Sequence, residues 1–274
     1  MSFSRAKAAL TQNRFSDLRW TAETGSTNAD VLGILTESAS GSPPPTVDVA
    51  LVADHQTAGR GRLDRTWEAP AGSSLLMTAG TTQVIDDDRR GLALTCMSLA
   101  AVEAIMAVAG FEAAIKWPND IVAVGAGEDN GDRKVAGVLA ELAPLEGGGA
   151  AVAVGIGVNC NWGAIPGHLE GIATSLDLLV EAEVDREDLA VALLVGFGRR
   201  LDLLDDADGT AAVVAEARSH SATIGRDVRV QLPAGELEGR AVGLDADGAL
   251  LVEAGEDASV HRVVVGDVIH VRPA

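Results

Sequence analysis

The run Val135-Ala136-Gly137-Val138-Leu139-Ala140-Glu141-Leu142 precedes a second run, Ala150-Ala151-Val152-Ala153-Val154-Gly155-Ile156-Gly157-Val158. β-Branched and small residues dominate both runs, a composition typical of strands at the centre of a sheet. We therefore expect these two strands in the middle of the main sheet.

Working outward from this pair, the sequence predicts five more strands and four helices in the same region. Strands are expected at 18–23, 47–54, 73–81, 113–116 and 121–124, and helices at 28–35, 89–109, 186–205 and 210–220. The helix over 89–109 is nearly all apolar, so it must be buried. Because hairpins do not alternate with helices here, we expect an α+β fold with a mixed, mainly antiparallel sheet rather than a Rossmann fold.

The pattern changes near Ser221, where short alternating strands separated by glycine-containing turns begin. They are expected at 227–232, 237–244, 250–254, 260–265 and 268–271. Strands at this spacing indicate a small barrel. We therefore predict two domains, residues 1–221 and 222–274.

Bulk composition limits the class of protein. With 274 residues the chain has room for one large and one small domain. It has 47% hydrophobic residues, no run of eighteen apolar ones and no apolar core in its first twenty residues, so we expect a cytoplasmic protein without a membrane segment or signal peptide. Cys96 and Cys160 lie in apolar surroundings and are expected to be free, buried thiols. The net charge of −19 argues against general nucleic-acid affinity.

The segment Gly59-Arg60-Gly61-Arg62-Leu63-Asp64-Arg65, here named the glycine–arginine loop, concentrates positive charge in this acidic chain. Its guanidinium groups repel one another unless an anion compensates, and glycine lets a backbone approach a ligand closely. The loop is therefore interpreted as a mobile segment that folds over a phosphate-bearing ligand. It is not a Walker A loop, and Gly155-Ile156-Gly157 lacks the third glycine of a dinucleotide fingerprint.

Lysine is rare, and its positions are informative. It occurs only at Lys7, Lys116 and Lys134, while the remaining eighteen of the 21 basic residues are arginine. A lysine ammonium is a compact point charge whose pKa responds to its surroundings. Lys116 and Lys134 lie in motif-like segments, which suggests a chemical need for them. The alternative is that both lie on strand ends without a role.

A group of polar residues near the first predicted helix forms a second candidate. Ser26, Thr27 and Asn28 offer hydroxyls and an amide at the helix start, which suits a small uncharged head group such as a urea. Helix capping is the alternative role for Ser26 or Thr27. Gln56 can add an amide contact or be an ordinary surface residue.

Three further residues can line the same site. Asn119 and Asp120 follow a Trp-Pro turn and can bind a ribose or a magnesium ion, or simply form a solvated turn. Trp67 ends the glycine–arginine loop, where it either walls an apolar pocket or anchors the loop to the core.

Taken together and in order, these motifs resemble those of the biotin–protein ligases over most of residues 24–160. The segments that carry the resemblance are Ser26-Thr27-Asn28, Gln56-Thr57-Ala58-Gly59-Arg60-Gly61-Arg62, Trp67, Lys116-Trp117-Pro118-Asn119-Asp120, Lys134-Val135-Ala136-Gly137-Val138-Leu139-Ala140-Glu141 and Gly155-Ile156-Gly157-Val158-Asn159. The resemblance implies a catalytic domain of the class II synthetase-like type followed by an SH3-like barrel.

The resemblance also implies a reaction and its partners. Biotin and ATP, with Mg²⁺, would form biotinyl-5′-AMP, and a lysine of a biotin carboxyl carrier domain of acetyl-CoA or acyl-CoA carboxylase would receive the biotin. Lys134, Arg60 and Arg62 would be catalytic. The biotin site would contain Ser26, Thr27, Asn28, Gln56, Arg60, Gly61, Arg62, Trp67, Lys134 and Gly137, and the nucleotide site Arg60, Arg62, Lys116, Asn119, Asp120, Lys134 and Asn159, with Asp120 near the metal. A homodimer is compatible with open sheet edges.

The chain departs from the family pattern in four places. Asp64 stands where the family often has glycine, and it can pair with Arg62 or Arg65 and tune loop closure. The segment 125–133 is long and acidic, without an assigned role. Trp162 follows the strand where the family has an adenine-covering loop, and it can stack on the base. No counterpart of the N-terminal DNA-binding domain is found, so the chain is expected to ligate and not to bind DNA.

Two rival functions remain open from the sequence. A lipoate or octanoyl ligase or transferase shares the fold, although the Gly-Arg-Gly-Arg and Lys-Trp-Pro-Asn-Asp strings favour biotin. A non-enzymatic biotin sensor or DNA-bound regulator is the second rival, and the acidic balance argues against it.

Overall fold

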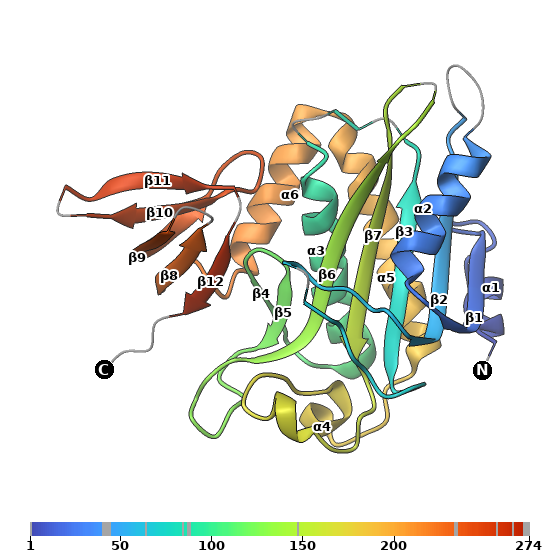
Figure 1. Ribbon diagram of the computed structural model, residues 1–274, viewed down its shortest axis with the longest axis horizontal. Coiled ribbons are helices and arrows are strands. Elements are labelled where there is room, and N and C mark those ends of the chain that lie inside the picture. The colour runs from blue at the N-terminus through green and yellow to red at the C-terminus, as the bar shows by residue number, and fades with distance from the viewer. Residues whose placement is uncertain are drawn as a thin grey trace.

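The structure is a computed structural model that describes residues 2–39, 45–63, 65–83, 85–86, 89–146, 148–232, 235–255, 257–264 and 266–270. It contains a seven-stranded sheet with helices on both faces and, beside it, a five-stranded antiparallel sheet near the C-terminus (Figure 1). The predicted α+β class is confirmed.

The large sheet has the strand order β1-β2-β3-β7-β6-β5-β4. Only β1 and β2 pair in parallel, and the other neighbours are antiparallel. The central pair expected from the sequence is confirmed, since β7 is the middle strand and β6 its neighbour. The bounds are β1 Leu18–Thr24, β2 Asp48–Gln56, β3 Ser74–Thr81, β4 Ala114–Lys116, β5 Asp120–Ala123, β6 Arg133–Pro144 and β7 Ala150–Asn159.

Helices cover the two faces of this sheet unequally. On one face α3 (Leu92–Ala109) and α5 (Arg186–Asp202) pack together, with α6 (Ala207–Ser219) beside α3; on the other face α2 (Thr27–Ser38) packs against β2, β3 and β7 (Figure 1). Two short helices lie outside the four predicted ones, α1 (Ser4–Ala9) and α4 (Leu176–Val180). The 3₁₀ segments are Gly167–Leu169 and Leu203–Asp205.

Helix α3 is long and apolar enough to cross a membrane if length and composition alone are considered. In the structure it lies inside the core, with residues such as Met97, Leu99 and Ile105 almost completely buried. The prediction that this helix is buried is confirmed, and its apolar character is explained by contacts with the sheet and with α5 and α6.

Strand β7 separates large and small side chains onto its two faces. Val152, Val154, Ile156 and Val158 belong to the main core beneath α3 and α5. Because neighbouring residues of a strand point to opposite faces, Ala151, Ala153, Gly155 and Gly157 face the other way, toward α2. The α2 face of the sheet is therefore shallow, which leaves room above it for side chains of the site.

The smaller sheet has the order β11-β10-β9-β8-β12 and is antiparallel throughout. Its strands are β8 Asp227–Leu232, β9 Gly235–Leu244, β10 Leu250–Ala254, β11 Ser259–Val263 and β12 Asp267–His270. Ser221, the predicted domain boundary, lies between α6 and β8 and makes an isolated bridge with Ile115 of β4. The exact boundary remains a prediction.

Candidate active site

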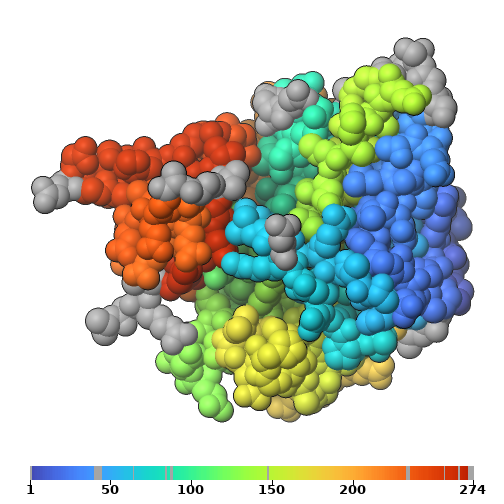
Figure 2. Space-filling model, viewed as in Figure 1, coloured from blue at the N-terminus to red at the C-terminus, as the bar shows by residue number. Residues whose placement is uncertain are grey.

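A cleft on the α2 face of the large sheet brings together twelve of the residues predicted from the sequence. The segment between β2 and β3, which contains the glycine–arginine loop, runs across this face of the molecule (Figures 1 and 2). The cleft is open to solvent, and about 850 Å³ of space at it, part of it bulk solvent, is not occupied by protein atoms. The predicted residues that line it are Ser26, Thr27, Asn28, Gln56, Arg60, Gly61, Arg62, Trp67, Asn119, Asp120, Lys134 and Gly137.

The floor of the cleft is a slot for the Trp67 indole. A Cβ on Gly157 would lie 2.4 Å from Trp67 Cε2, and one on Gly137 would lie 2.9 Å from Cζ3. Any larger residue at either position would displace the ring. The glycines of β6 and β7 are therefore needed for close approach of an aromatic side chain. Trp67 lines the cleft, and its contact with an apolar part of a ligand remains a prediction.

Hydroxyls and amides form the polar end of the cleft. Gln56 Oε1 accepts hydrogen bonds from the backbone N–H of Thr27 at 2.8 Å and from its Oγ1 at 3.0 Å. Thr78 on β3 donates toward Asn28 Oδ1 at 2.6 Å and lies 2.8 Å from Thr27 Oγ1. Ser26 occupies the N-cap position of α2 but makes no side-chain capping bond, so the capping alternative has no support there. These groups are fixed by one another and offer a rigid polar surface.

Glu141 connects this polar end to the glycine–arginine loop. Its Oε2 accepts from Asn28 Nδ2 at 2.7 Å and from the Arg60 guanidinium at 3.0 Å. Asn28 Nδ2 also donates to the Leu139 carbonyl at 3.2 Å. One carboxylate on β6 thus orients both a residue of the α2 start and a cation of the loop.

The C-terminal domain reaches into the cleft and holds the other two loop arginines. Arg62 donates to the Gly266 carbonyl at 3.2 Å and to Asn119 Oδ1 at 3.4 Å, and burial lowers the pKa of its guanidinium below the usual value. Arg65 forms an ion pair with Asp267 at the start of β12. Asp267 is itself a cleft-lining residue, so the site is built from both domains.

Lys134 provides the fourth positive charge. Its Nζ lies 2.6 Å from Asp120 Oδ1 and 5.2 Å from the centre of a Trp67 ring, a cation–π distance. The side chains of Lys134 and Asp120 are each 28% exposed, so an incoming ligand can contact both.

Every cation of the cleft therefore has a protein partner that an anionic ligand can replace. Carboxylates hold Arg60, Arg65 and Lys134, and a carbonyl and an amide hold Arg62. Phosphate and carboxylate are the anions that a guanidinium fork binds in two-pronged geometry. The arrangement suits a reaction in which two anionic groups meet between fixed positive charges.

Two predicted residues lie outside the cleft lining. Asn159 is only 1% exposed, and its Nδ2 donates to the carbonyls of Thr174 at 2.9 Å and Lys134 at 3.4 Å. Lys116 lies near His270, whose pKa it helps to lower. Direct nucleotide contacts for these two residues remain predictions.

The departures from the family pattern can also be located. Trp162 donates its indole N–H to Ser74 Oγ at 2.9 Å at the start of β3, and stacking on an adenine remains a prediction. Asp64 lies outside the described residues. The acidic segment 125–133 forms a hairpin tip between β5 and β6, beside the C-terminal domain (Figure 1).

The residues that line the cleft include several that were not predicted from the sequence, and four of them matter for its charge and shape: Arg65, Gly155, Gly157 and Asp267. Arg65 lies in the glycine–arginine loop, and its positive charge is a sequence signal for a place in the site. Gly155 and Gly157 form a sequence motif, but only the structure shows why glycine is needed at these positions. A Cβ on Gly155 would lie 2.2 Å from Asn28 Oδ1. Asp267 had no local signal in the sequence.

The residues present fit a magnesium ion that arrives with phosphates. Among the described residues no group of three or more His, Cys, Asp or Glu side chains is arranged to hold a metal. Mg²⁺ commonly binds through one or two carboxylates plus substrate phosphates and water. Asp120, with Asn119 beside it, can supply such a single carboxylate.

Comparison with known proteins agrees with this geometry. Residues 25–161 match the model of the biotin/lipoate A/B protein ligase family, and residues 223–271 match the biotin protein ligase C-terminal domain. The chain is 38% identical to the biotin–[acetyl-CoA-carboxylase] ligase of Mycobacterium tuberculosis, covering 92% of this chain and 88% of that protein. It is 32% identical to the bifunctional ligase/repressor BirA of Bacillus subtilis, covering 75% of this chain and 62% of that protein.

A solved structure is similar over nearly the whole chain. The biotin protein ligase from Aquifex aeolicus in complex with biotin and ATP superimposes with a TM-score of 0.75 at 27% identity, covering 94% of this chain and all of that one. The motif order, the cleft and both family matches agree. The chain therefore belongs to the biotin protein ligases of the biotin/lipoate A/B protein ligase family.

Proposed function

We propose that this protein uses ATP to activate biotin as biotinyl-5′-AMP and transfers the biotin to a lysine of the biotin carboxyl carrier domain of an acetyl-CoA or acyl-CoA carboxylase. The observation that carries the proposal is the convergence of Arg60, Arg62, Arg65 and Lys134 on a cleft that has a tryptophan slot at its floor and an amide-rich end. The family membership supports the same reaction.

The first half-reaction joins two anions, and the cations of the cleft lower the cost of bringing them together. An oxygen of the biotin carboxylate bonds to the α-phosphorus of ATP, the bond from that phosphorus to the bridging oxygen breaks, and pyrophosphate leaves with the electron pair. Lys134 can exchange Asp120 for the carboxylate and α-phosphate, and Arg60 can exchange Glu141 for the same region. Fixed charges aimed at the developing negative charge are the largest catalytic contribution expected here.

Arg62 and Arg65 are positioned for the remaining phosphates, because both are held from the C-terminal domain at the edge of the cleft. Mg²⁺, when bound, would add positive charge at the pyrophosphate leaving group, and Asp120 is the residue that would hold it.

The uncharged part of biotin fits the opposite end of the cleft. Ser26, Thr27 and Gln56 present hydroxyl and amide groups of the kind that pair with a ureido ring. The Trp67 indole offers an apolar wall for the remainder of the molecule. The glycine–arginine loop lines the cleft and can shield the mixed anhydride from water.

In the second half-reaction a neutral lysine amine of the carrier attacks the acyl carbon. A C–N bond forms, the C–O bond to the phosphate breaks, and AMP leaves while the amine loses a proton. The same cations stabilise the departing AMP phosphate.

We place the reaction in the cytoplasm. Cys96 and Cys160 are free and buried, and burial raises the pKa of each thiol to about 12, so both stay protonated and unreactive. This is the state expected of structural cysteines in a reducing compartment.

The decisive experiment is mass spectrometry of a carrier domain after incubation with biotin, MgATP and this protein. The expected result is the mass increase of one biotinyl group on a single lysine, dependent on ATP. Absence of the modification with carriers from several carboxylases would overturn the proposal.

Lipoate activation is the second candidate, because the family model spans biotin and lipoate ligases. Incubation with ATP and each acid, followed by hydroxylamine, traps any acyl-adenylate as a hydroxamate. We expect a hydroxamate from biotin, and one from lipoate alone would reassign the substrate.

A further inference from the structure

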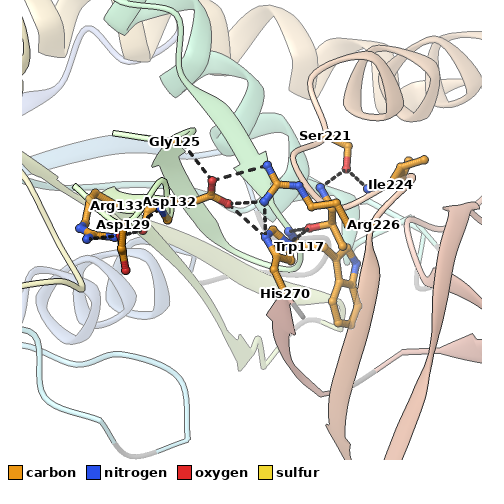
Figure 3. Close-up of polar contacts among 11 residues, drawn as sticks. Trp117, Gly125, Asp129, Asp132, Arg133, Ser221, Ile224, Arg226 and His270 are labelled. Atoms are coloured by element: carbon orange, nitrogen blue, oxygen red, sulfur yellow. Dashed lines mark hydrogen bonds and ion pairs between the residues drawn. The ribbon is translucent and has the colours of Figure 1, made fainter. Parts of the chain in front are cut away.

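The tip that joins β5 to β6 makes an ionic contact with the C-terminal domain through one carboxylate. Asp132, which lies in the tip just before β6, accepts from Arg226 at 2.7 Å and from the backbone N–H of Gly125 at 3.2 Å, and it lies 3.1 Å from His270 Nδ1 (Figure 3). The side chains of Asp132 and His270 are each only 11% exposed. The contact is therefore buried at the seam between the two domains.

Two groups face Nδ1 of the His270 ring, and one faces Nε2. Nδ1 lies 3.1 Å from Asp132 Oδ2 and 3.0 Å from Arg226 Nη1, and Nε2 lies 3.1 Å from Thr223 Oγ1. The Thr223 hydroxyl oxygen accepts the backbone N–H of Trp117 at 3.0 Å. Burial, and then the charge of Lys116, lower the pKa of His270 to about 4, so the ring is neutral at physiological pH.

This network is close in the sequence to the Lys134–Asp120 ion pair. Asp132 stands two residues before Lys134, and Trp117 stands three residues before Asp120. Trp117 also donates its indole N–H to the Gly248 carbonyl of the C-terminal domain at 3.0 Å. The strands that carry Lys134 and Asp120 are thus tied to the second domain close to the points where they enter the cleft.

Strand β12 connects the network to the glycine–arginine loop. His270 ends the strand at the seam, and Asp267 begins it at the cleft, where it pairs with Arg65. The preceding residue, Gly266, holds Arg62 through its carbonyl. A four-residue strand is short and stiff, so fixing its end at His270 restricts where Gly266 and Asp267 can lie.

We propose that Asp132, Arg226 and His270 form an interdomain clamp that positions β12, and through it Arg62 and Arg65, for binding of the nucleotide phosphates. Asp132 and His270 are positioning residues in this scheme, since neither lines the cleft among the residues described. The inference rests on the proposed ATP-dependent activation of biotin. It gives the acidic tip a role that the sequence left unassigned.

The test replaces Asp132 by the isosteric asparagine, Asp132→Asn, which removes the charge and keeps the shape. We expect KM for ATP in biotinyl-AMP formation to rise about tenfold, while the dissociation constant for biotin changes less than about twofold. Hydrogen–deuterium exchange of the peptide spanning Asp267–His270 should become faster, because the end of the strand is released.

Asp129→Asn is the matched control. Asp129 belongs to the same tip, but it pairs with Arg133 at 2.7 Å inside the tip. It should leave both KM for ATP and the exchange of β12 unchanged. Equal effects of the two variants would show that the tip acts only through its own folding, and an unchanged KM in Asp132→Asn would overturn the clamp.

A double-mutant cycle separates positioning from general destabilisation. If Asp132 acts through β12, the effects of Asp132→Asn and Asp267→Asn on KM for ATP should combine to less than their product. Multiplicative effects would contradict the coupling. If Asp132→Asn folds poorly, His270→Gln takes its place in the cycle with Asp267→Asn. The exchange measurement needs no turnover, so it tests the clamp even if the protein does not activate biotin.

Discussion

Two regions of the molecule use the same guanidinium–carboxylate contact to different ends. In the cleft, Arg60 pairs with Glu141 at 3.0 Å while its side chain is 49% exposed. In the core, Arg200 pairs with Glu103 at 2.7 Å and with Glu216 at 2.5 Å while its side chain is 3% exposed. The chemistry is alike, and only the access of other anions differs.

Access decides whether such a pair can take part in function. Neither carboxylate partner of Arg200 can be replaced without uncovering a buried charge, so these pairs join α3, α5 and α6 permanently. Arg60 and Lys134 line the cleft, where a ligand can replace the protein carboxylate that each contacts. The cost is smallest for the more exposed Arg60, because exposed ion pairs contribute little net stability. We expect removal of a cation to impair catalysis in the cleft and stability in the core.

The largest effect is expected for Lys134→Ala. We expect the rate of biotinyl-AMP formation to fall about 1000-fold, equivalent to about 4 kcal/mol, because a charge aimed at the reacting groups is lost. Biotin binding, measured by calorimetry, should persist because the polar end and the Trp67 slot remain. Near-normal turnover would remove this lysine from the mechanism.

Two controls interpret that result. Lys7→Ala removes an exposed lysine on α1 and should be silent. In Lys134→Ala the Asp120 carboxylate loses its partner and can repel phosphate, so the double variant with Asp120→Asn distinguishes loss of the cation from gain of a free anion. If the double variant regains the full rate, the lysine serves only to neutralise Asp120.

Arg200→Met tests the core side of the comparison. Removing the buried guanidinium takes its partner from Glu216 and one of two partners from Glu103, which keeps Arg199. We expect the free energy of unfolding to fall by about 2 kcal/mol, because charge-assisted hydrogen bonds are lost. Adenylate formation per folded molecule should not change. Urea denaturation measures the first quantity and a single-turnover assay the second.

Arg199→Met is the matched control, since Arg199 contacts the same Glu103 but is 58% exposed. Its effect on unfolding should stay below about 1 kcal/mol. Equal destabilisation by the two substitutions would show that burial is not the deciding variable.

Gly157→Ala tests the slot rather than the charges. The added methyl group would lie 2.4 Å from Trp67 Cε2, so the indole must move out of the slot. We expect KM for biotin to rise about thirtyfold, equivalent to about 2 kcal/mol. Gly33→Ala is the control: its Cβ meets no atom within 4 Å, and it lies in helix α2. Unaltered KM in Gly157→Ala would show that the ring position does not matter.

Gly157 also shows which features of the site the sequence predicts and which it does not. The alternation Val154-Gly155-Ile156-Gly157-Val158 predicts a strand, and the order of motifs predicts which segments approach one another. Period-two alternation alone does not reveal which face carries the ligand, because that depends on where α2 and the loop pack. The need for glycine at position 157 therefore follows from the position of the Trp67 ring and not from the sequence pattern alone.

Contacts between residues far apart in the chain are the second feature that the sequence does not predict. Asp267 and Arg65 are 202 residues apart in the sequence, and no local sequence pattern predicts their ion pair. The strands of the C-terminal domain were predicted within a few residues, but their docking on the cleft depends on the seam at Trp117 and Asp132. Short α4 was missed because five residues carry too little periodicity to identify a helix.

Arg60→Ala sharpens the comparison from the cleft side. Because Arg60 is half exposed and shares Glu141 with Asn28, its loss should not unfold the protein. We expect biotinyl-AMP to escape about tenfold faster in a single-turnover assay without carrier, since the loop loses one of its bonds to the intermediate. Arg19→Ala, an exposed arginine paired with Asp17, is the control. Unchanged escape would argue that the loop does not retain the intermediate.

The smallest expected effect is on the pH dependence of the free energy of unfolding, which should differ between variants of the core pair and of the cleft pair. The hydrogen bond from Arg200 holds the pKa of Glu216 below its usual value of 4.5. A carboxylate with a lowered pKa in the folded state contributes stability that is present above pH 4.5 and is lost as the pH falls through the folded-state pKa. The free energy of unfolding should therefore decline on acidification below 4.5, and less steeply in Arg200→Met than in the unmodified protein. Arg60→Ala should leave the contribution of Glu216 to that slope unchanged, because Arg60 pairs with Glu141 and not with Glu216. If both variants flatten the slope equally, access to solvent does not distinguish the core pair from the cleft pair.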